Sequence, residues 1–369
     1  MPNEQASILA EERNCIGHLT LNRPAGLNAL TLEMIRLLQE RLDAWREDPR
    51  ILAVVLRAAG EKAFCAGGDI RFLYESHTSG DTLHFTFFEE EYALDQTLHG
   101  YPKPVLALMD GFVLGGGMGL AQGATLRVIS ERTRMGMPET GIGYFPDVGG
   151  SYFLSRLPGN LGRYLGITGT YIRAADALYA GLADWCVAHE HFAELDRRLD
   201  TLQWTLSPRQ ELITLLAALG SKKLPGSELK AMRPAIEAHF AADDMLELRA
   251  RLAAETRSEF HDWAEETLRL VDSRSPLAVS VTLELLRRGQ TLSLSECFAL
   301  ELHLDRQWFD QGDLIEGVRA LLIDKDKNPR WNPPSLAQVS PQRVQAFFSG
   351  VAPLEARPDT SEGSMPCTI

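Results

Sequence analysis

The chain has 369 residues, of which 45% are hydrophobic and 24% charged, as in a globular protein with one large domain and an appended part, or with two domains. Its net charge of −13 disfavours non-specific binding to nucleic acid or anionic lipid, because each phosphate contact needs a lysine or arginine. No run of residues reaches the roughly 18 apolar positions that a membrane span requires, and the N-terminus lacks the pattern of a secretory signal or transit peptide. We therefore expect no nucleic-acid partner and no membrane partner.

In chain order, the first half alternates strands, turns and helices. Residues 15–22 combine β-branched side chains with partial alternation, which predicts a strand, and Thr31 is placed to cap the helix that follows. The continuous apolar run at 51–58 is typical of a strand covered on both faces. Short helices are expected after the glycine turn at 64–70 and at 115–123, a longer helix at 82–98, and strands at 103–111 and 125–130. This order predicts an α/β or α+β layered domain rather than a doubly wound fold.

From about His189 the strand signal disappears. Residues 192–206, 258–271 and 294–312 have helical periodicity, and prolines separate these segments. We therefore expect a core of residues 13–188 that carries the site, a helical region of residues 189–340, and a mobile tail of residues 341–369 whose last part contains few apolar side chains.

The cysteines and histidines give no sign of a disulfide framework or a metal site. Five cysteines are scattered along the chain without a CxxC pair, which indicates a reducing compartment, and we expect the cytoplasm. The stretch His189–His191 (HEH) lacks a third ligand nearby, so we expect a surface turn and no metal. Cys65 has no histidine beside it in sequence and is expected to be a small buried residue.

Three consecutive glycines, Gly115–Gly117, stand where a helix begins, although a glycine inside a helix costs about 1 kcal/mol relative to alanine. They can serve close packing of the helix on a strand, or they can expose backbone N–H groups to an oxygen that becomes negative during a reaction. The spacing fits neither a dinucleotide fingerprint nor a P-loop. One N–H from this turn and one from the turn at 64–70 can meet at a single carbonyl oxygen.

Two acids, Glu139 and Asp147, lie in the apolar segment 137–150 (MPETGIGYFPDVGG), each directly after a proline. Carboxyl groups in such surroundings have shifted pKa values and are candidates for acid–base catalysis. The alternative is structural, because Pro-Glu is a common helix start and aspartate a common helix cap. The spacing alone leaves both interpretations open.

Several segments, taken in order, resemble the crotonase (enoyl-CoA hydratase/isomerase) superfamily: LNRPAGLNAL (21–30), KAFCAGGDI (62–70), KPVLALMDGFVLGGGMGL (103–120) and MPETGIGYFPDVGG (137–150). The chain is similar to the 3-hydroxyisobutyryl-CoA hydrolase branch through FFEEEY (87–92), the continuation of the last segment to Gly169, and EGVRALLIDKDKNPRWNP (316–333). The resemblance covers about residues 16–339. It implies an α/β fold in which a spiral of ββα turns precedes a mostly helical C-terminal region.

The resemblance also implies roles for individual residues. The backbone N–H groups of Gly68 and Gly116 match the oxyanion hole that holds the thioester carbonyl. Glu139 and Asp147 match the catalytic pair, Glu91 matches a substrate-binding acid, and Gly116 and the catalytic pair also contact the substrate. Glu139 either attacks the carbonyl or activates a water, and the sequence leaves both routes open.

Coenzyme A, by the same resemblance, lies along two turns and contacts Ala29, Ala66, Asp69 and Ile70 mainly through backbone atoms. CoA is part of the substrate, so the resemblance implies an acyl-CoA substrate and no separate cofactor. The superfamily commonly forms trimers or paired trimers, and we expect a homo-oligomer.

Gly119 decides between activities within the superfamily. Hydratases carry a glutamate at this place, and its absence here favours hydrolysis of 3-hydroxyisobutyryl-CoA, a step of valine degradation, over hydration or isomerisation of a short branched enoyl-CoA. We expect the space at Gly119 to accept a substrate branch or a water. A non-catalytic acyl-CoA binder is the third possibility, but a binder has no need of Glu139 and Asp147.

Overall fold

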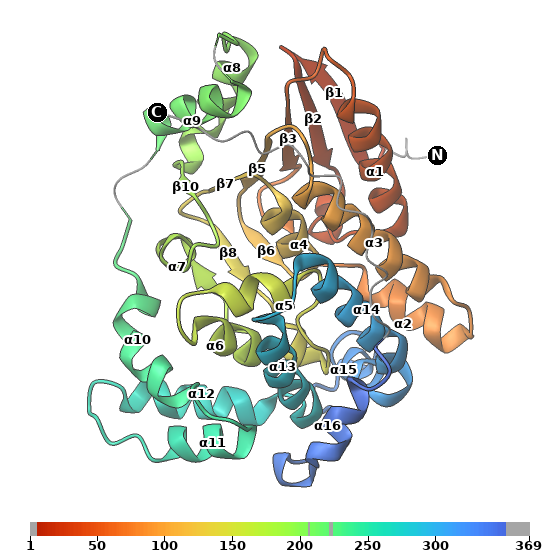
Figure 1. Ribbon diagram of the computed structural model, residues 1–369, viewed down its shortest axis with the longest axis vertical. Coiled ribbons are helices and arrows are strands. Elements are labelled where there is room, and N and C mark those ends of the chain that lie inside the picture. Colours follow the sequence, from red (N-terminus) through yellow and green to blue (C-terminus); the bar gives the residue numbers. More distant parts are fainter. Residues whose placement is uncertain (1–5, 206, 221–223, 352–369) are drawn as a thin grey trace, which may run out of the picture.

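The computed structural model describes residues 6–205, 207–220 and 224–351, and its strands form two sheets (Figure 1). The larger sheet has the order β1 (Ile8–Arg13), β2 (Ile16–Leu21), β3 (Ala53–Ala58), β5 (Val105–Met109), β7 (Leu126–Ile129) and β10 (Trp185–Cys186). Its β1–β2 pair is antiparallel and the other pairs are parallel. The smaller sheet has the order β4 (Ala63–Cys65), β6 (Phe112–Leu114), β8 (Arg134–Gly136) and β9 (Ile172–Arg173), with an antiparallel β8–β9 pair.

Successive strands alternate between the two sheets. β3 is followed by β4, β5 by β6 and β7 by β8, so each turn of the chain adds one strand to each sheet before a helical segment follows. The expected spiral of ββα turns is therefore confirmed. Because β4, β6 and β8 are parallel neighbours, the turns that follow them lie at the same edge of the smaller sheet. This arrangement brings both glycine turns and the segment of Glu139 together.

The described part of the first half contains seven α-helices, of which the first four were expected from the sequence and the last three were not. They are α1 (Leu32–Arg46), α2 (Ile70–Ser79), α3 (Leu83–His99), α4 (Gly116–Gly123), α5 (Gly150–Phe153), α6 (Leu161–Thr168) and α7 (Ala174–Ala180), and a 3₁₀ turn, η2 (Glu139–Ile142), precedes α5. Thr31 caps α1, because its hydroxyl accepts a hydrogen bond from the N–H of Met34 at 3.2 Å.

The C-terminal helices cover the sheets on two sides. α8 (Phe192–Asp200) and α9 (Pro208–Leu219) pack on one face of the larger sheet, where Leu199 and Leu216 join Val55 and Val128 in one apolar cluster (Figure 1). The later helices are α10 (Glu228–His239), α11 (Met245–Ala253), α12 (His261–Ser273), α13 (Pro276–Gly289), α14 (Leu294–Gln311), α15 (Leu314–Val318) and α16 (Pro341–Phe347). α13 packs on α5 and α6, and α14 packs on α3 and α5.

One apolar core runs through both halves of the chain, so the division expected at residue 188 does not separate two cores. Leu154 and Leu165 of the first half share a cluster with Leu285 and Leu304 of the second. The helix expected at 192–206 ends earlier, at Asp200.

Both ends of the chain differ from the expectation. The sheet begins before residue 13, because β1 pairs along β2; this strand gave no signal in the sequence because only Ile8 of its six side chains is buried. The tail does not begin at residue 341, because α16 buries Val344 and Phe347 against the core. The rest of the expected tail, residues 352–369, lies outside the described residues.

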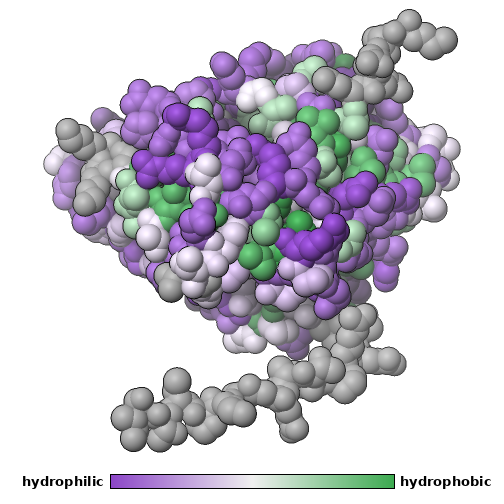
Figure 2. Space-filling model, turned by 90° about the horizontal axis from the view of Figure 1, so that it is seen from above, coloured by the Kyte–Doolittle hydropathy of each residue, from purple (hydrophilic) through white to green (hydrophobic). Residues whose placement is uncertain are grey.

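Among the described residues, none of the helices combines the length and the apolar character needed to cross a bilayer. Figure 2 shows one face of the molecule, on which hydrophilic residues surround several separate hydrophobic patches. The homo-oligomer that we expect from the sequence stays a prediction.

Candidate active site

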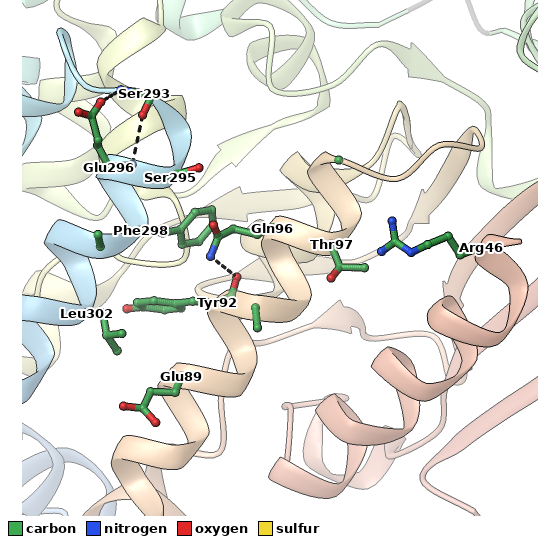
Figure 3. A pocket seen from close by; sticks show the side chains of 13 residues that line it. Arg46, Glu89, Tyr92, Gln96, Thr97, Ser293, Ser295, Glu296, Phe298 and Leu302 are labelled. Atoms are coloured by element: carbon green, nitrogen blue, oxygen red, sulfur yellow. Dashed lines mark hydrogen bonds between the residues drawn. The ribbon is translucent and has the colours of Figure 1, made fainter. Parts of the chain in front are cut away.

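A cavity of about 80 Å³ lies where the turns after β4, β6 and β8 meet α3 and α15. The resemblance assigns a role in catalysis, substrate binding or CoA binding to nine residues. Seven of these nine line the cavity: Ala66, Gly68, Ile70, Glu91, Gly116, Glu139 and Asp147. A larger and more open groove of about 980 Å³ lies between α3 and α14 (Figure 3), and none of the nine residues lines it. The smaller cavity is therefore the candidate active site, because it gathers the residues with the chemistry.

The glycines at the start of α4 have both a packing role and an exposed backbone. Gly115 has a φ of 49°, and a side chain at Gly117 would overlap the carbonyl oxygen of Cys65, so glycine is needed at both positions. The N–H groups of Gly68 and Gly116 line the cavity and have no hydrogen-bond acceptor within the described chain. Two unpaired N–H groups from different turns can both donate hydrogen bonds to one ligand oxygen atom.

Glu139 is the first residue of η2 and its side chain is buried. Its Oε2 atom has no hydrogen-bond partner among the described residues. Burial and, to a lesser degree, the nearby Asp147 raise the pKa of Glu139 well above its ordinary value. A buried carboxyl group that faces a cavity with an unpaired oxygen can act on a ligand there, and a helix start does not require this arrangement.

Asp147 lies in the turn between η2 and α5. Its Oδ2 atom is 2.9 Å from the hydroxyl of Tyr92. Burial raises the pKa of Asp147 to about 7, although the Tyr92 hydroxyl acts in the opposite direction. Glu91, one residue before Tyr92 on α3, is also buried, and its Oε1 atom lies unpaired against Gly116.

Two of the expected CoA-binding residues, Ala29 and Asp69, do not line the cavity. Asp69 caps α2 through the N–H of Phe72 at 3.3 Å, and Arg23 donates a hydrogen bond to it at 2.7 Å. Arg23 also donates to the carbonyl oxygen of Ala29 at 3.1 Å. Arg23 thus joins the two turns at the side of the cavity, and the CoA contacts of these residues stay predictions.

The space expected beside Gly119 is filled, so the prediction that it accepts a substrate branch or a water was wrong. A Cβ atom at Gly119 would lie 2.6 Å from Oδ2 of Asp95 and 2.8 Å from Cβ of Val148. The Asp95 carboxyl group, which comes from α3, therefore occupies the place next to this glycine. Asp95 is fully buried, and neither of its oxygens has a hydrogen-bond partner among the described residues.

Three residues of α14 that the sequence analysis did not single out support the turn of Asp147. Glu301 accepts hydrogen bonds from the N–H groups of Gly149 at 2.7 Å and Ser151 at 2.8 Å. Asp305 lies 2.7 Å from the Tyr92 hydroxyl and also bonds Tyr144, and Trp308 donates to the carbonyl oxygen of Gly143 at 2.8 Å. The signal for them was present, because positions 301, 305 and 308 share the buried face of one helix and two of them are acids.

The residues set aside from the sequence stay outside the site. Cys65 is buried, and burial raises the pKa of its thiol to about 12, so it is a packing residue as expected. His189–His191 form the short 3₁₀ turn η4, in which no side chain is buried. Within the described ranges, no group of three or more histidine, cysteine or acidic side chains is arranged to hold a metal ion.

The sequence pattern of the enoyl-CoA hydratase/isomerase family matches residues 16–348, and the chain belongs to this family. Among its curated relatives is the 3-hydroxyisobutyryl-CoA hydrolase, mitochondrial, of Danio rerio, which is 40% identical over 354 residues, or 94% of this chain and 90% of the relative. The Homo sapiens protein of the same name is 37% identical over 349 residues, or 93% of this chain and 89% of the relative.

Two solved structures resemble the chain over almost its whole length. A carnitinyl-CoA dehydratase from Mycobacterium thermoresistibile has a TM-score of 0.87 and 37% identity and covers 95% of this chain and 98% of its own. An enoyl-CoA hydratase from Rhodobacter sphaeroides 2.4.1 has a TM-score of 0.84 and 35% identity, with the same coverage. The crotonase-like fold, with its mostly helical C-terminal region, is therefore confirmed.

Proposed function

We propose that the protein hydrolyses the thioester of 3-hydroxyisobutyryl-CoA to 3-hydroxyisobutyrate and CoA. The observation that carries the proposal is the meeting of Glu139, Asp147 and two unpaired backbone N–H groups in one buried cavity. The names of the curated relatives, which are 36–40% identical to this chain, support the choice of reaction.

In the proposed reaction, the thioester carbonyl oxygen accepts hydrogen bonds from the N–H groups of Gly68 and Gly116, which stabilise the negative charge that forms on it. Glu139, in its ionised form, attacks the carbonyl carbon or removes a proton from an attacking water. Asp147 orients that water or the substrate hydroxyl and gives a proton to the departing CoA sulfur. On the water route Asp147 regains the proton that Glu139 took, and on the attack route it takes a proton from the water that splits the anhydride. The sum over one turnover is therefore the addition of one water across the carbon–sulfur bond.

Coenzyme A is proposed to approach through the turns of Ala29 and Ala66–Ile70, which border the cavity on one side. The turns are tied together, because the N–H of Ala66 bonds the carbonyl oxygen of Leu27 and the N–H of Leu30 bonds that of Gly67, at 3.1 and 2.8 Å. Because the two turns are already ordered, binding of the pantetheine to their backbone atoms does not have to offset the entropy cost of ordering them.

The alternative is a hydratase or isomerase that acts on a short branched acyl-CoA, as the names of the two solved structures suggest. Gly119 argues against this alternative, because α4 has a glycine where hydratases carry a glutamate. In its favour, the Asp95 carboxyl group lies against that glycine and supplies an acid from the neighbouring helix. A binder without catalysis is the third candidate, and the buried unpaired Glu139 opposes it.

The decisive experiment follows two reactions with the same purified protein. Release of free thiol from 3-hydroxyisobutyryl-CoA is measured with a no-substrate control for the five cysteines of the protein. Loss of enoyl absorbance is measured with crotonyl-CoA and methacrylyl-CoA. We expect thiol release without enoyl loss; enoyl loss without thiol release would replace the hydrolase by a hydratase, and binding without either reaction would favour the binder.

Gly119→Ala tests whether the place next to Gly119 is truly filled. Because the added methyl group would meet the Asp95 carboxyl group and the branched Val148, we expect a loss of about 1–3 kcal/mol in the free energy of unfolding. Gly100→Ala is the matched control, since its methyl group would only reach ordinary contact with the carbonyl oxygen of Gln96 at 3.5 Å. Denaturant unfolding compares the two variants, and equal stability would restore the idea of an open space at Gly119.

A further inference from the structure

Tyr92 connects the active site to α14. Figure 3 shows its side chain extending from α3 toward α14, and Tyr92 is one of the residues that line the larger groove between these helices. The ring packs between Phe88 and Phe298 and is almost fully buried. Its hydroxyl lies 2.9 Å from Oδ2 of Asp147 and 2.7 Å from Oδ2 of Asp305, so one phenol bridges two carboxyl groups.

The number of protons restricts what this bridge can be. The Tyr92 hydroxyl carries one proton and can donate it to only one carboxylate. The other carboxyl group must then be protonated and donate to the phenol oxygen. When the two acids share one carboxyl proton, either Asp147 is ionised and Asp305 protonated, or the reverse. The second oxygen of Asp305 accepts from the Tyr144 hydroxyl in both arrangements.

We propose that Tyr92 and Asp305 form a proton relay that sets the protonation of Asp147 during thioester hydrolysis. The Asp305 proton passes to the Tyr92 oxygen while the Tyr92 proton passes to Asp147, and the reverse step returns both. One carboxyl proton moves between the two acids, and no net charge is created. The relay rests on the proposed function, in which Asp147 gives a proton to the CoA sulfur. Asp305 then reprotonates Asp147 through Tyr92, and the reverse step returns that proton to Asp305 when a proton from the attacking water reaches Asp147.

The surroundings favour one shared proton over two separate charges. Glu91 and Asp95 of α3, Glu139 of η2 and Glu301 of α14 interact electrostatically with members of the pair, and these four groups are all acids. Two ionised carboxylates on one buried phenol would repel each other in a poor solvent for charge. Glu301 is not part of the relay, because its oxygens are taken by the start of α5.

Tyr92 and Asp305 are positioning residues, because they act on the substrate only through Asp147. Tyr92→Phe keeps the ring packing but removes the donor to Asp147, so the ionised form of Asp147 loses a hydrogen bond. Asp305→Asn keeps the contacts, because its amide donates to the Tyr92 oxygen and its carbonyl accepts from Tyr144. The Tyr92 proton then points permanently at Asp147, and the ionised form of Asp147 is favoured.

The two variants are therefore expected to move the pH midpoint of kcat for thiol release in opposite directions, each by about one pH unit. Tyr92→Phe raises the midpoint and Asp305→Asn lowers it. Tyr101→Phe is the matched control, because it removes a buried hydroxyl that donates to the carbonyl oxygen of Leu42 at 2.6 Å, away from the site. It is expected to leave the midpoint unchanged. Shifts in the same direction, or no shift in either variant, would overturn the relay.

A second readout works without turnover. Carbon-13 NMR of labelled aspartate carboxyls follows the titration of Asp147 in the substrate-free wild type and in each variant, with Asp147→Asn to assign its signal. Opposite shifts there support the relay even if the wild type releases no thiol, in which case only the proposed function fails. Unchanged titration of Asp147 in both variants refutes the relay even if the protein is an active hydrolase.

Discussion

Glu139→Gln is expected to lower kcat for thiol release by about 10²–10⁴-fold, because the amide can neither attack the thioester nor accept a proton from water. The fold should be nearly unaffected. Burial raises the pKa of Glu139, so the fold does not stabilise its charge, and glutamine has the same shape and no charge. Thiol release and the melting temperature measured on the same preparation separate the two effects.

The control for this variant is Glu190→Gln, which makes the same change on an exposed side chain of η4 and is expected to leave kcat unchanged. Binding of the thioester to the Glu139→Gln protein, measured by calorimetry, should persist because the N–H groups of Gly68 and Gly116 remain. Turnover equal to that of the wild type would remove Glu139 from the mechanism and leave Asp147 as the principal acid.

The second large effect is a loss of stability as the pH rises from 6.5 to 8. Glu301 has a folded-state pKa of about 8 and Asp147 of about 7, and the pKa values of Glu91, Asp95 and Asp305 are also raised, in each case mainly by burial. The unfolded chain releases these protons above about pH 4.5, whereas the folded chain keeps them. Each retained proton therefore lowers the free energy of unfolding by about 1.4 kcal/mol per pH unit until the folded-state pKa is passed.

Between pH 6.5 and 8 the buried histidine and cysteine side chains contribute little to this trend. His18, His84 and His99 have lowered pKa values, mainly through burial, so they stabilise the fold as the pH rises, but only up to about 6.5. Above about pH 8 the buried Cys65 and Cys186 thiols begin to act in the same direction as the acids. Calorimetry between these limits should give a falling melting temperature, by at least about 2 °C per pH unit.

Glu301→Gln serves as the internal comparison for this trend. It removes one of the protons that the folded chain retains, so the melting temperature should fall less steeply with pH than in the wild type. A melting temperature that stays constant or rises between pH 6.5 and 8 would show that the acids are ionised in the folded protein, and the buried cluster would then need another source of compensation.

The sequence predicted the part of the fold that depends on local patterns. The glycine turns, the cap at Thr31 and the apolar strand at 51–58 follow from backbone preferences and hydrophobic periodicity, which act within a few residues. The strand Ile8–Arg13 was missed because it lies at the sheet edge, where polar side chains are tolerated and the alternation disappears.

The same division applies to the site. Gly68, Glu91, Gly116, Glu139 and Asp147 were found through motifs, and the structure brings all five into one cavity. Glu301, Asp305 and Trp308, which support them, belong to no motif; their only local signal is two acids on the buried face of one helix, and their role depends on contacts between residues far apart in sequence.

Asp305 lies 158 positions after Asp147 in the chain, yet both bond the same phenol. Similarly, the carboxyl group beside Gly119 comes from Asp95 on another helix, so the glycine alone suggested an empty space where there is none.

The support that α14 gives to the turn of Asp147 has a consequence for recombination between family members. A hybrid that joined residues 1–188 to the later helices of another protein would need an acceptor at position 301 for the Gly149 and Ser151 amides. Without it, two buried donors remain unpaired, each at a cost of about 1–3 kcal/mol. The later helices can therefore not be exchanged independently of the first half. A working hybrid must keep Glu301, Asp305 and Trp308 together with the turn of Asp147 that they support.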